Sequence, residues 1–130
     1  MAEDEKTILC IEDEREMIDL FKIILGRRGY RVSGALGGEE GLQRAEELEP
    51  DLILLDLMMP GMDGWEVLQR MRANEKLQKI PVIIVTAKSQ EIDRVLALHV
   101  AQVNDYVTKP FGPQELIDSV NRVLVSKSAT

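Results

Sequence analysis

The chain has 130 residues, of which 45% are hydrophobic and 30% are charged, a balance typical of one soluble globular domain. Sixteen lysines and arginines against 23 aspartates and glutamates give a net charge of −7, which disfavours binding to nucleic-acid phosphates and to anionic membrane surfaces. The single cysteine, Cys10, excludes an intrachain disulfide, and the acidic stretch MAEDEK has no apolar signal-peptide core. We expect one cytoplasmic domain over residues 1–130, with its core in residues 6–125 and a frayed tail at 126–130.

Short apolar runs alternate with longer, helix-like segments along the whole chain. In chain order, five runs have the composition of strands: residues 7–11, 30–35, 51–55, 82–85 and 106–108. After each run comes a segment with apolar side chains at the spacing of one helix face: residues 17–25, 42–48, 67–71, 90–98 and 113–124. Asp63 is a good N-cap for the third of these helices, and Pro113 suits the first position of the last.

The runs LILL and VIIV contain no polar residue, which indicates strands covered on both faces of a parallel sheet. Helices that alternate with such strands predict an α/β fold with a doubly wound sheet and helices on both of its faces. In folds of this kind the site lies outside the carboxyl ends of the strands, at a switch in strand order. The residues that follow each strand are therefore the first candidates for function.

Side chains of complementary chemistry stand at four of the predicted strand ends. The first strand ends in Glu12 and Asp13, and the third ends in Asp56. The fourth ends in Thr86, and the fifth leads to Lys109. Three carboxylates repel one another unless a cation joins them, and oxygen ligands suit a hard ion such as Mg²⁺, or Mn²⁺ in its place. A carboxylate can attack phosphorus while an ammonium and a hydroxyl hold phosphoryl oxygens, so the four ends together predict metal-assisted phosphoryl transfer.

Other residues are expected to have structural roles. Asp51 and Asp105 lie at the opposite, N-terminal ends of strands and are expected to be solvated. Ile92, Val95 and Leu96 are expected to form the core face of the fourth helix. Further apolar residues near its end are expected either to pack under the following loop or to dock a partner: Leu98, Val100, Ala101 and Val103.

Four motifs occur in a fixed order: ILCIEDE, ILLDLMMPGMDG, PVIIVTA and DYVTKPF. Through these motifs the chain resembles, over essentially its whole length, the receiver domain of two-component response regulators. The resemblance implies a (βα)5 flavodoxin-like fold with strand order 2-1-3-4-5. It also implies a phospho-accepting signalling switch, which assists its own dephosphorylation and is not a turnover enzyme on an external substrate.

The resemblance implies a role for each acid at the strand ends. Asp56 would be the phosphorylated residue, and Lys109 would contact the phosphoryl group. Glu12 and Asp13 would bind Mg²⁺ together with Asp56. The backbone carbonyl of Met58 would complete the protein ligands of the metal.

The resemblance also implies how the switch moves. Thr86 would move toward the phosphate, and Tyr106 would swing inward as the second half of the switch. The peptide bond between Lys109 and Pro110 would be cis. The phosphoryl donor would be a sensor histidine kinase or a phosphotransfer protein. A downstream protein would dock on the face made by the fourth helix, the fifth strand and the fifth helix.

Two departures from the family pattern carry their own expectations. Gln102 and Val103 stand where the family usually has Gly-Ala, which predicts a changed turn before the fifth strand because only glycine takes positive φ without strain. Arg94 and Glu115 suit a dimer through the fourth and fifth helices, but Ser119 stands where a basic partner is common. We therefore expect a monomer or a weak dimer.

Three alternative functions share parts of this pattern. An Mg²⁺-dependent phosphatase with an aspartate nucleophile usually needs a second aspartate two residues later, where this chain has Met58. A flavin-binding module of the same topology needs a hydroxyl-rich loop after the first strand, where residues 12–14 are acidic. A receiver-shaped binding surface without phosphorylation would not need the intact acid cluster.

Overall fold

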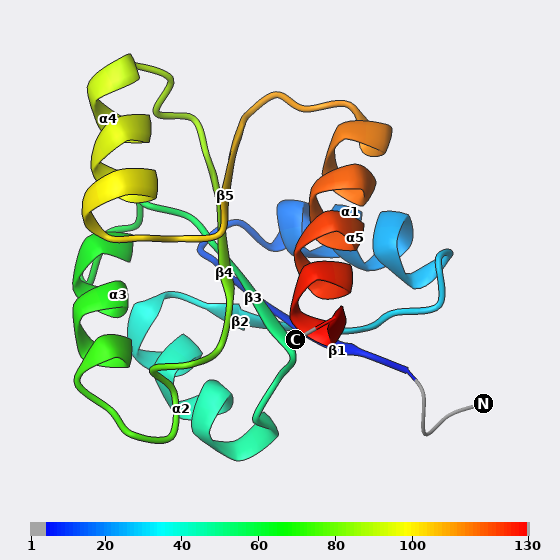
Figure 1. Cartoon of the computed structure of the whole chain (residues 1–130), viewed down its shortest axis with the longest axis horizontal. Helices are drawn as coiled ribbons and strands as arrows, with labels where there is room; N and C mark the ends of the chain where they lie inside the picture. Colours follow the sequence, from blue (N-terminus) through cyan, green and yellow to red (C-terminus); the bar gives the residue numbers. More distant parts are fainter. Residues whose placement is uncertain (1–4, 130) are drawn as a thin grey trace.

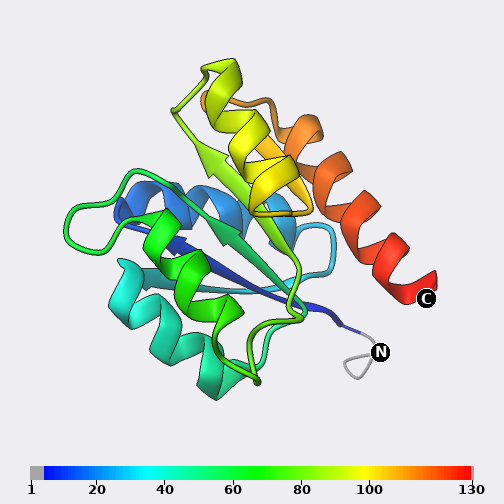
Figure 2. The same ribbon diagram turned by 60° about the vertical axis from the view of Figure 1, so that its left-hand side comes forward.

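The computed structural model describes residues 5–129, in which a five-stranded parallel sheet lies between two layers of helices (Figure 1, Figure 2). The strands are β1 (Thr7–Glu12), β2 (Arg31–Leu36), β3 (Leu52–Leu55), β4 (Val82–Thr86) and β5 (Asp105–Thr108). The helices are α1 (Arg15–Gly26), α2 (Gly38–Leu48), α3 (Gly64–Arg72), α4 (Glu91–Val95) with its π-helical continuation η2 (Leu96–Val100), and α5 (Pro113–Ala129). The strand order is β2-β1-β3-β4-β5, so the predicted fold and strand order are confirmed.

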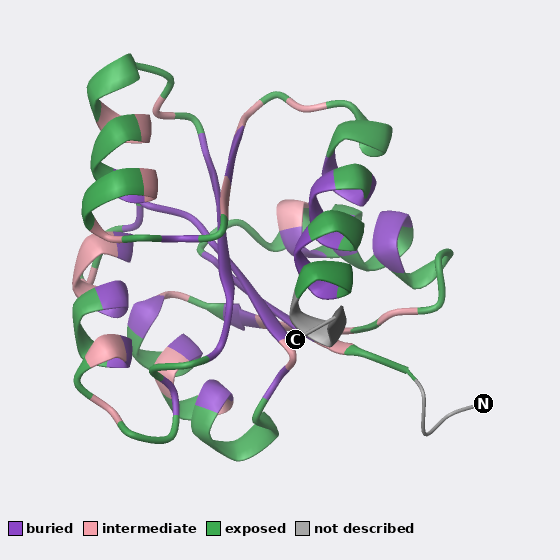
Figure 3. Ribbon diagram, viewed as in Figure 1, coloured by how far each residue is buried: buried purple, intermediate pink, exposed green. Residues whose placement is uncertain are grey.

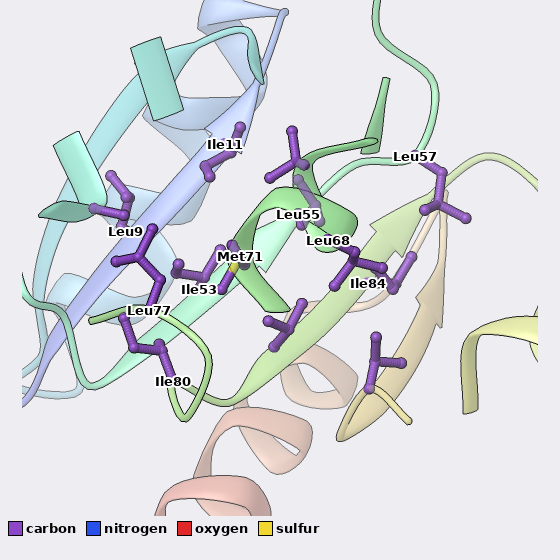
Figure 4. Packing of buried hydrophobic residues seen from close by; sticks show 14 of the residues in the cluster. Leu9, Ile11, Ile53, Leu55, Leu57, Leu68, Met71, Leu77, Ile80 and Ile84 are labelled. Carbon is purple, nitrogen blue, oxygen red and sulfur yellow. The ribbon is translucent and has the colours of Figure 1, made fainter. Parts of the chain in front are cut away.

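Both faces of the sheet are buried, which explains the uninterrupted apolar strands. Ile53 and Leu55 of β3 pack on the side of α2, α3 and η2. Leu52 and Leu54 point the other way, toward α1 and α5, because successive side chains of a strand alternate between faces. Figure 3 shows that β3 and β4 are buried along their length and β1 along nearly all of it, whereas the edge strands β2 and β5 are partly exposed. Figure 4 shows strand and α3 side chains packed in the first of these clusters.

The core is almost entirely aliphatic, as the aromatic content of 4% requires. The rings of Phe21 and Phe111 are stacked with their centroids 5.9 Å apart, and they join α1 to the loop after β5. Cys10 is fully buried, and burial raises the pKa of its thiol above the ordinary range. This cysteine therefore packs as a small hydrophobe.

The fourth helix does not pack as predicted. Ile92, Val95 and Leu96 were expected in the core, but 57%, 38% and 39% of their surfaces are exposed. The buried residue of the segment is Ala97. The α-helical part is five residues long and then widens into a π-helix, so the 3.6-residue period does not continue along it. Val103, in the loop between η2 and β5, is buried in the core, whereas Val100 is 71% exposed.

The turn before β5 keeps a glycine-like backbone without a glycine. Gln102 has φ of 57°, in the left-handed region that favours glycine. The guanidinium of Arg72 donates hydrogen bonds to the carbonyl oxygens of Ala101, at 3.2 Å, and of Gln102, at 3.4 Å. The side chain of Arg72, the last residue of α3, thus holds the end of η2 and the strained residue Gln102 in place.

The two acids at the N-terminal ends of strands are bonded rather than merely solvated, which corrects the prediction. Asp51 accepts a hydrogen bond from the backbone N–H of Thr7 at 2.8 Å. Asp105 accepts from the hydroxyl of Ser119 and from Arg122, both at 2.6 Å. The two contacts of Asp105 tie β5 to α5. Ser119 is itself buried, with 1% of its surface exposed.

The C-terminal helix is longer than expected. We predicted a frayed tail at residues 126–130, but α5 continues to Ala129, and Thr130 lies outside the described residues. Leu116, Val120 and Val123 are buried on its inner face, as predicted. Among the residues that the structure describes, no helix combines the length and the apolar character needed to cross a bilayer.

Replacement of Ile53 by alanine is expected to lower the free energy of unfolding by about 2–5 kcal/mol, because the residue is fully buried between β1 and β4. The matched change Ile92→Ala, on the exposed face of α4, is expected to cost less than about 0.5 kcal/mol. Urea denaturation followed by circular dichroism measures both. Equal losses would mean that Ile92 is packed in solution.

Ser119→Ala is expected to cost about 1–3 kcal/mol at neutral pH, because Asp105 loses a buried donor. Burial raises the pKa of Asp105, but its hydrogen bonds from Ser119, the Tyr106 N–H and Arg122 outweigh this and hold the pKa below its ordinary value. A pKa lowered by folding stabilises the folded state above the ordinary aspartate pKa of about 4, and this stabilisation is lost as the pH falls below it.

The difference in urea midpoint between the wild type and Ser119→Ala should therefore shrink as the pH is lowered from about 7 to about 3. Ser126→Ala, at an exposed position of the same helix, is the control and should show no pH-dependent difference. A Ser119→Ala deficit that is constant with pH would show that the hydroxyl does not act through Asp105.

Candidate functional site

The carboxyl edge of the sheet gathers the side chains that the sequence placed at strand ends. β1 ends at Glu12, and Asp13 follows it. Asp56 is the first residue after β3, and its backbone N–H donates to the carbonyl oxygen of Ile11 on β1 at 3.2 Å. Carboxylate oxygens of the three acids lie within 4.8 Å of one another. The parallel sheet therefore concentrates three carboxylates at one point, as predicted.

The cluster is buried on the protein side and open on one side. Glu12 and Asp56 are 1% and 5% exposed, whereas Asp13 is exposed to solvent. Thr86, at the end of β4, is fully buried. Asp13 therefore forms the side of the cluster from which a ligand can arrive.

The ammonium group of Lys109 joins two of the acids. Its Nζ donates to Oε1 of Glu12 at 2.7 Å and to Oδ2 of Asp56 at 3.0 Å. Burial alone would lower the pKa of Lys109, but the hydrogen bonds to Glu12 and Asp56 outweigh it and raise the pKa above the ordinary value. Lys109 is therefore a permanent cation at this site.

One ammonium does not neutralise three carboxylates. Burial raises the pKa of Glu12 to about 7, and the neighbouring charge of Asp56 also favours the protonated form, while Lys109 opposes both. Three oxygen donors with an excess of negative charge fit a hard divalent cation such as Mg²⁺, which takes one or two carboxylates and keeps several waters. The donor set is thus suited to the metal that the sequence predicted.

The loop after β3 fixes the Asp56 carboxylate. Oδ1 of Asp56 accepts a hydrogen bond from the backbone N–H of Met58 at 2.9 Å. The loop then returns to the sheet, and the N–H of Gly64 donates to the carbonyl oxygen of Leu57 at 3.1 Å. Asp63 caps α3 by accepting from the N–H of Glu66 at 3.0 Å, as predicted.

Gly64 permits the close approach of α3 to this loop. A Cβ atom on Gly64 would lie 2.7 Å from Cα of Leu57 and closer still to the carbonyl oxygen of Asp56. Real Cβ atoms do not approach backbone atoms so closely, so the backbone of Asp56 would have to shift. Gly64 is therefore part of the site, although no pattern in the sequence points to it.

The loop after β5 positions Lys109. Its backbone N–H donates to the carbonyl oxygen of Thr86 at 2.8 Å, which continues the pairing of β5 with β4. The peptide bond between Lys109 and Pro110 is cis, as the resemblance implies. The hydrogen bond from Lys109 to Thr86 holds the end of the edge strand against the end of its neighbour.

Thr86 and Tyr106 are connected through a third residue. The hydroxyl of Tyr106 donates to the carbonyl oxygen of Lys88 at 2.8 Å, and the N–H of Lys88 lies 3.5 Å from the Thr86 hydroxyl oxygen. Tyr106 is 3% exposed, so its ring points into the protein. No sequence pattern points to Lys88, because its contribution is a backbone carbonyl that every residue possesses.

Comparisons with known proteins agree with this geometry. The family described as response regulator receiver domain matches residues 8–121. The alkaline phosphatase synthesis transcriptional regulatory protein PhoP of Bacillus subtilis (strain 168) is 44% identical over 119 residues, or 92% of this chain and 48% of that protein. The chain thus spans about half the length of this curated relative.

Solved structures agree as well. The N-terminal domain of a response regulator receiver protein from Methanoculleus marisnigri JR1 is 37% identical, with a TM-score of 0.75, over 92% of this chain and 96% of that chain. A CheY-like response regulator receiver domain protein from Methanospirillum hungatei JF-1 is 28% identical, with a TM-score of 0.87, over 97% of this chain and 98% of that chain.

Gly64→Ala is expected to lower the free energy of unfolding by about 1–3 kcal/mol and to disturb the Asp56 loop, because the added methyl overlaps backbone atoms. Gly26→Ala is the matched control, since nothing lies within 4 Å of a Cβ there and φ is not positive. Chemical denaturation and the amide NMR shifts of residues 56–58 measure the two effects. Unchanged stability and shifts in Gly64→Ala would show that α3 does not press on this loop.

Proposed function

Since this chain belongs to the response regulator receiver domain family, we propose that Asp56 accepts a phosphoryl group from a phosphohistidine with Mg²⁺ as cofactor. The observation that carries this proposal is the Lys109 ammonium, which lies 3.0 Å from Asp56 inside a cluster of three carboxylates. A sensor histidine kinase or a phosphotransfer protein is the proposed donor. As a receiver domain, the chain is a signalling switch and not an enzyme that turns over external substrates.

The proposed step moves one phosphoryl group. A carboxylate oxygen of Asp56 forms a bond to phosphorus as the bond between phosphorus and the donor's imidazole nitrogen breaks, and the nitrogen keeps the electron pair. Lys109 would then contact the phosphoryl oxygens from its place beside Asp56. Charge on the transferred group would develop next to a cation that is already in position.

We propose that Glu12, Asp13, Asp56 and the backbone carbonyl of Met58 hold the metal. A bound Mg²⁺ supplies positive charge that offsets the charge on the phosphoryl oxygens. Supporting this assignment, carboxylate oxygens of the three acids lie within 4.8 Å of one another. The side chain of Met58 is exposed, whereas its backbone N–H donates to Asp56, so the backbone is the part of Met58 that lies near the site.

The proposed switch runs from Thr86 to the face made by α4, β5 and α5. A phosphoryl group on Asp56 adds charge beside Thr86 and Lys109, and Lys88 links Thr86 to Tyr106. The phosphoryl group would bias the balance between two arrangements of α4 and β5. A downstream protein that binds one arrangement better would read the state of Asp56.

The phosphatase alternative lacks a proton donor in the expected place. Met58 occupies the position two residues after Asp56, it is 52% exposed, and its thioether has no proton to give to a leaving group. Assistance of its own dephosphorylation by this domain remains part of the proposal. It concerns the aspartyl phosphate that the domain itself carries.

Incubation with acetyl phosphate and Mg²⁺ is expected to add the mass of one phosphoryl group to the intact wild-type protein. Asp56→Ala should abolish the addition, because the nucleophile is gone. Asp19→Ala, at an exposed position of α1, is the matched control and should be labelled like the wild type. Asp13→Asn should raise the Mg²⁺ concentration required by at least about tenfold, since a charged ligand becomes neutral.

Three results would contradict the proposal. Labelling that survives Asp56→Ala would place the phosphoryl group elsewhere. Labelling that survives chelation of Mg²⁺ would remove the metal from the reaction. Wild-type protein that binds Mg²⁺ but accepts no phosphoryl group from acetyl phosphate, phosphoramidate or a phosphohistidine protein would be a receiver-shaped binding surface without phosphorylation.

A further inference from the structure

The backbone, the ring and the hydroxyl of Tyr106 each make a specific contact in addition to the packing of the ring in the core. It lies on β5, which is an edge strand, so its peptide N–H and carbonyl oxygen on the outer side have no neighbouring strand to pair with. The N–H donates instead to Oδ1 of Asp105 at 2.9 Å. The carbonyl oxygen accepts from Nη1 of Arg94 at 3.2 Å. Both outward-facing peptide groups of this residue are therefore satisfied by side chains.

Arg94 also contacts the aromatic ring of the same residue. Its guanidinium carbon lies 5.3 Å from the centre of the Tyr106 ring, a distance suited to a cation–π interaction. One side chain of α4 thus holds both the backbone and the ring of Tyr106. The planar guanidinium can do this because its donors and its face point in different directions.

The contacts of Arg94 matter because α4 has little other attachment. None of the residues from Glu91 to Val95 is buried. The neighbouring Asp93 lies 3.9 Å from Nζ of Lys88, and the carbonyl oxygen of Lys88 accepts the Tyr106 hydroxyl. The hydroxyl, ring and carbonyl of Tyr106 are thus fixed by α4 and by the loop that leads into it.

We propose that Arg94 is a positioning residue that keeps Tyr106 in its buried orientation and makes the tyrosine and α4 move as one unit. This inference deepens the proposed function, because it assumes that Tyr106 belongs to the phosphorylation switch. In this arrangement α4 cannot leave β5 without freeing the ring. Conversely, the ring cannot turn to solvent unless Arg94 releases it.

The orientation of Tyr106 has a spectroscopic readout that needs no phosphorylation. Burial raises the pKa of Tyr106 to about 12, the charge of Asp93 adds to the rise, and Arg94 opposes it. Loss of Arg94 therefore has two opposite consequences. If the ring stays buried, removal of a cation raises the pKa further; if the ring turns to solvent, the pKa falls toward the ordinary value of about 10.

The test compares variants in a Tyr30→Phe background, where Tyr106 is the remaining tyrosine of the chain. Phenolate absorbance is measured at about pH 10.5, between the ordinary and the raised pKa, with circular dichroism at the same pH to verify folding. Arg94→Ala is expected to raise the phenolate signal at least about tenfold over the background protein. Arg94→Met, which keeps an aliphatic stem but no charge or donor, should do the same and serves if the alanine variant does not fold.

Arg70→Ala is the matched control, because Arg70 is an exposed helix arginine paired with Glu66 and far in sequence from the switch. It should leave the phenolate signal unchanged. A signal in folded Arg94→Ala and Arg94→Met that stays at or below the background level would overturn the inference, since Tyr106 would then remain buried without Arg94. Failure of acetyl phosphate, phosphoramidate and a phosphohistidine protein to label Asp56 would instead contradict the proposed function, and the absorbance result would be unaffected.

Discussion

Repulsion among three carboxylates is the constraint around which the rest of this molecule is arranged. The parallel sheet brings Glu12, Asp13 and Asp56 to one edge, where two of them are shielded from water and cannot disperse their charge. The ammonium of Lys109 reaches both buried acids from the end of the edge strand. It makes the cluster compatible with folding and still leaves an excess of negative charge. A cluster with an excess of negative charge, as a cation site requires, is thus a direct result of the strand order.

The same strand order connects the acid cluster to the surface. β4 and β5 are adjacent, so the strand that ends at Thr86 lies beside the strand that carries Tyr106 and Lys109. The loop after β4 receives the hydroxyl of Tyr106, and the helix after that loop receives its carbonyl oxygen through Arg94. A short series of contacts therefore links the strand ends to α4, and this is the route that the proposed switch would use.

More of the site than of the surface could be predicted from the sequence. The positions of Glu12, Asp56 and Lys109 could be predicted because each follows an apolar run. All strands of a parallel sheet run the same way, so the residues at their carboxyl ends meet at one edge. The packing of Ile92 could not be predicted, since the pattern assumed an α-helical period that the π-helix interrupts. The bonds of Asp105 to α5 depend on tertiary contacts across 14 and 17 residues. Lys88 accepts through its backbone carbonyl oxygen, a group that is the same in every residue and so cannot be predicted from residue type.

The exposed fourth helix has a consequence for how this domain fluctuates. Within α4 and η2, Ala97 is the buried residue, so separating the segment from the sheet exposes little apolar surface. Segments of this kind open by themselves, at a free energy well below that of unfolding the whole domain. The two large clusters of the sheet set how often the entire chain unfolds. The segment from 91 to 100 contributes Ala97 to the first cluster and packs Leu98 against it, so we expect the segment to open more often than the whole chain unfolds. Global stability and the readiness of the helix to detach are therefore separate properties, and evolution can adjust one without altering the other.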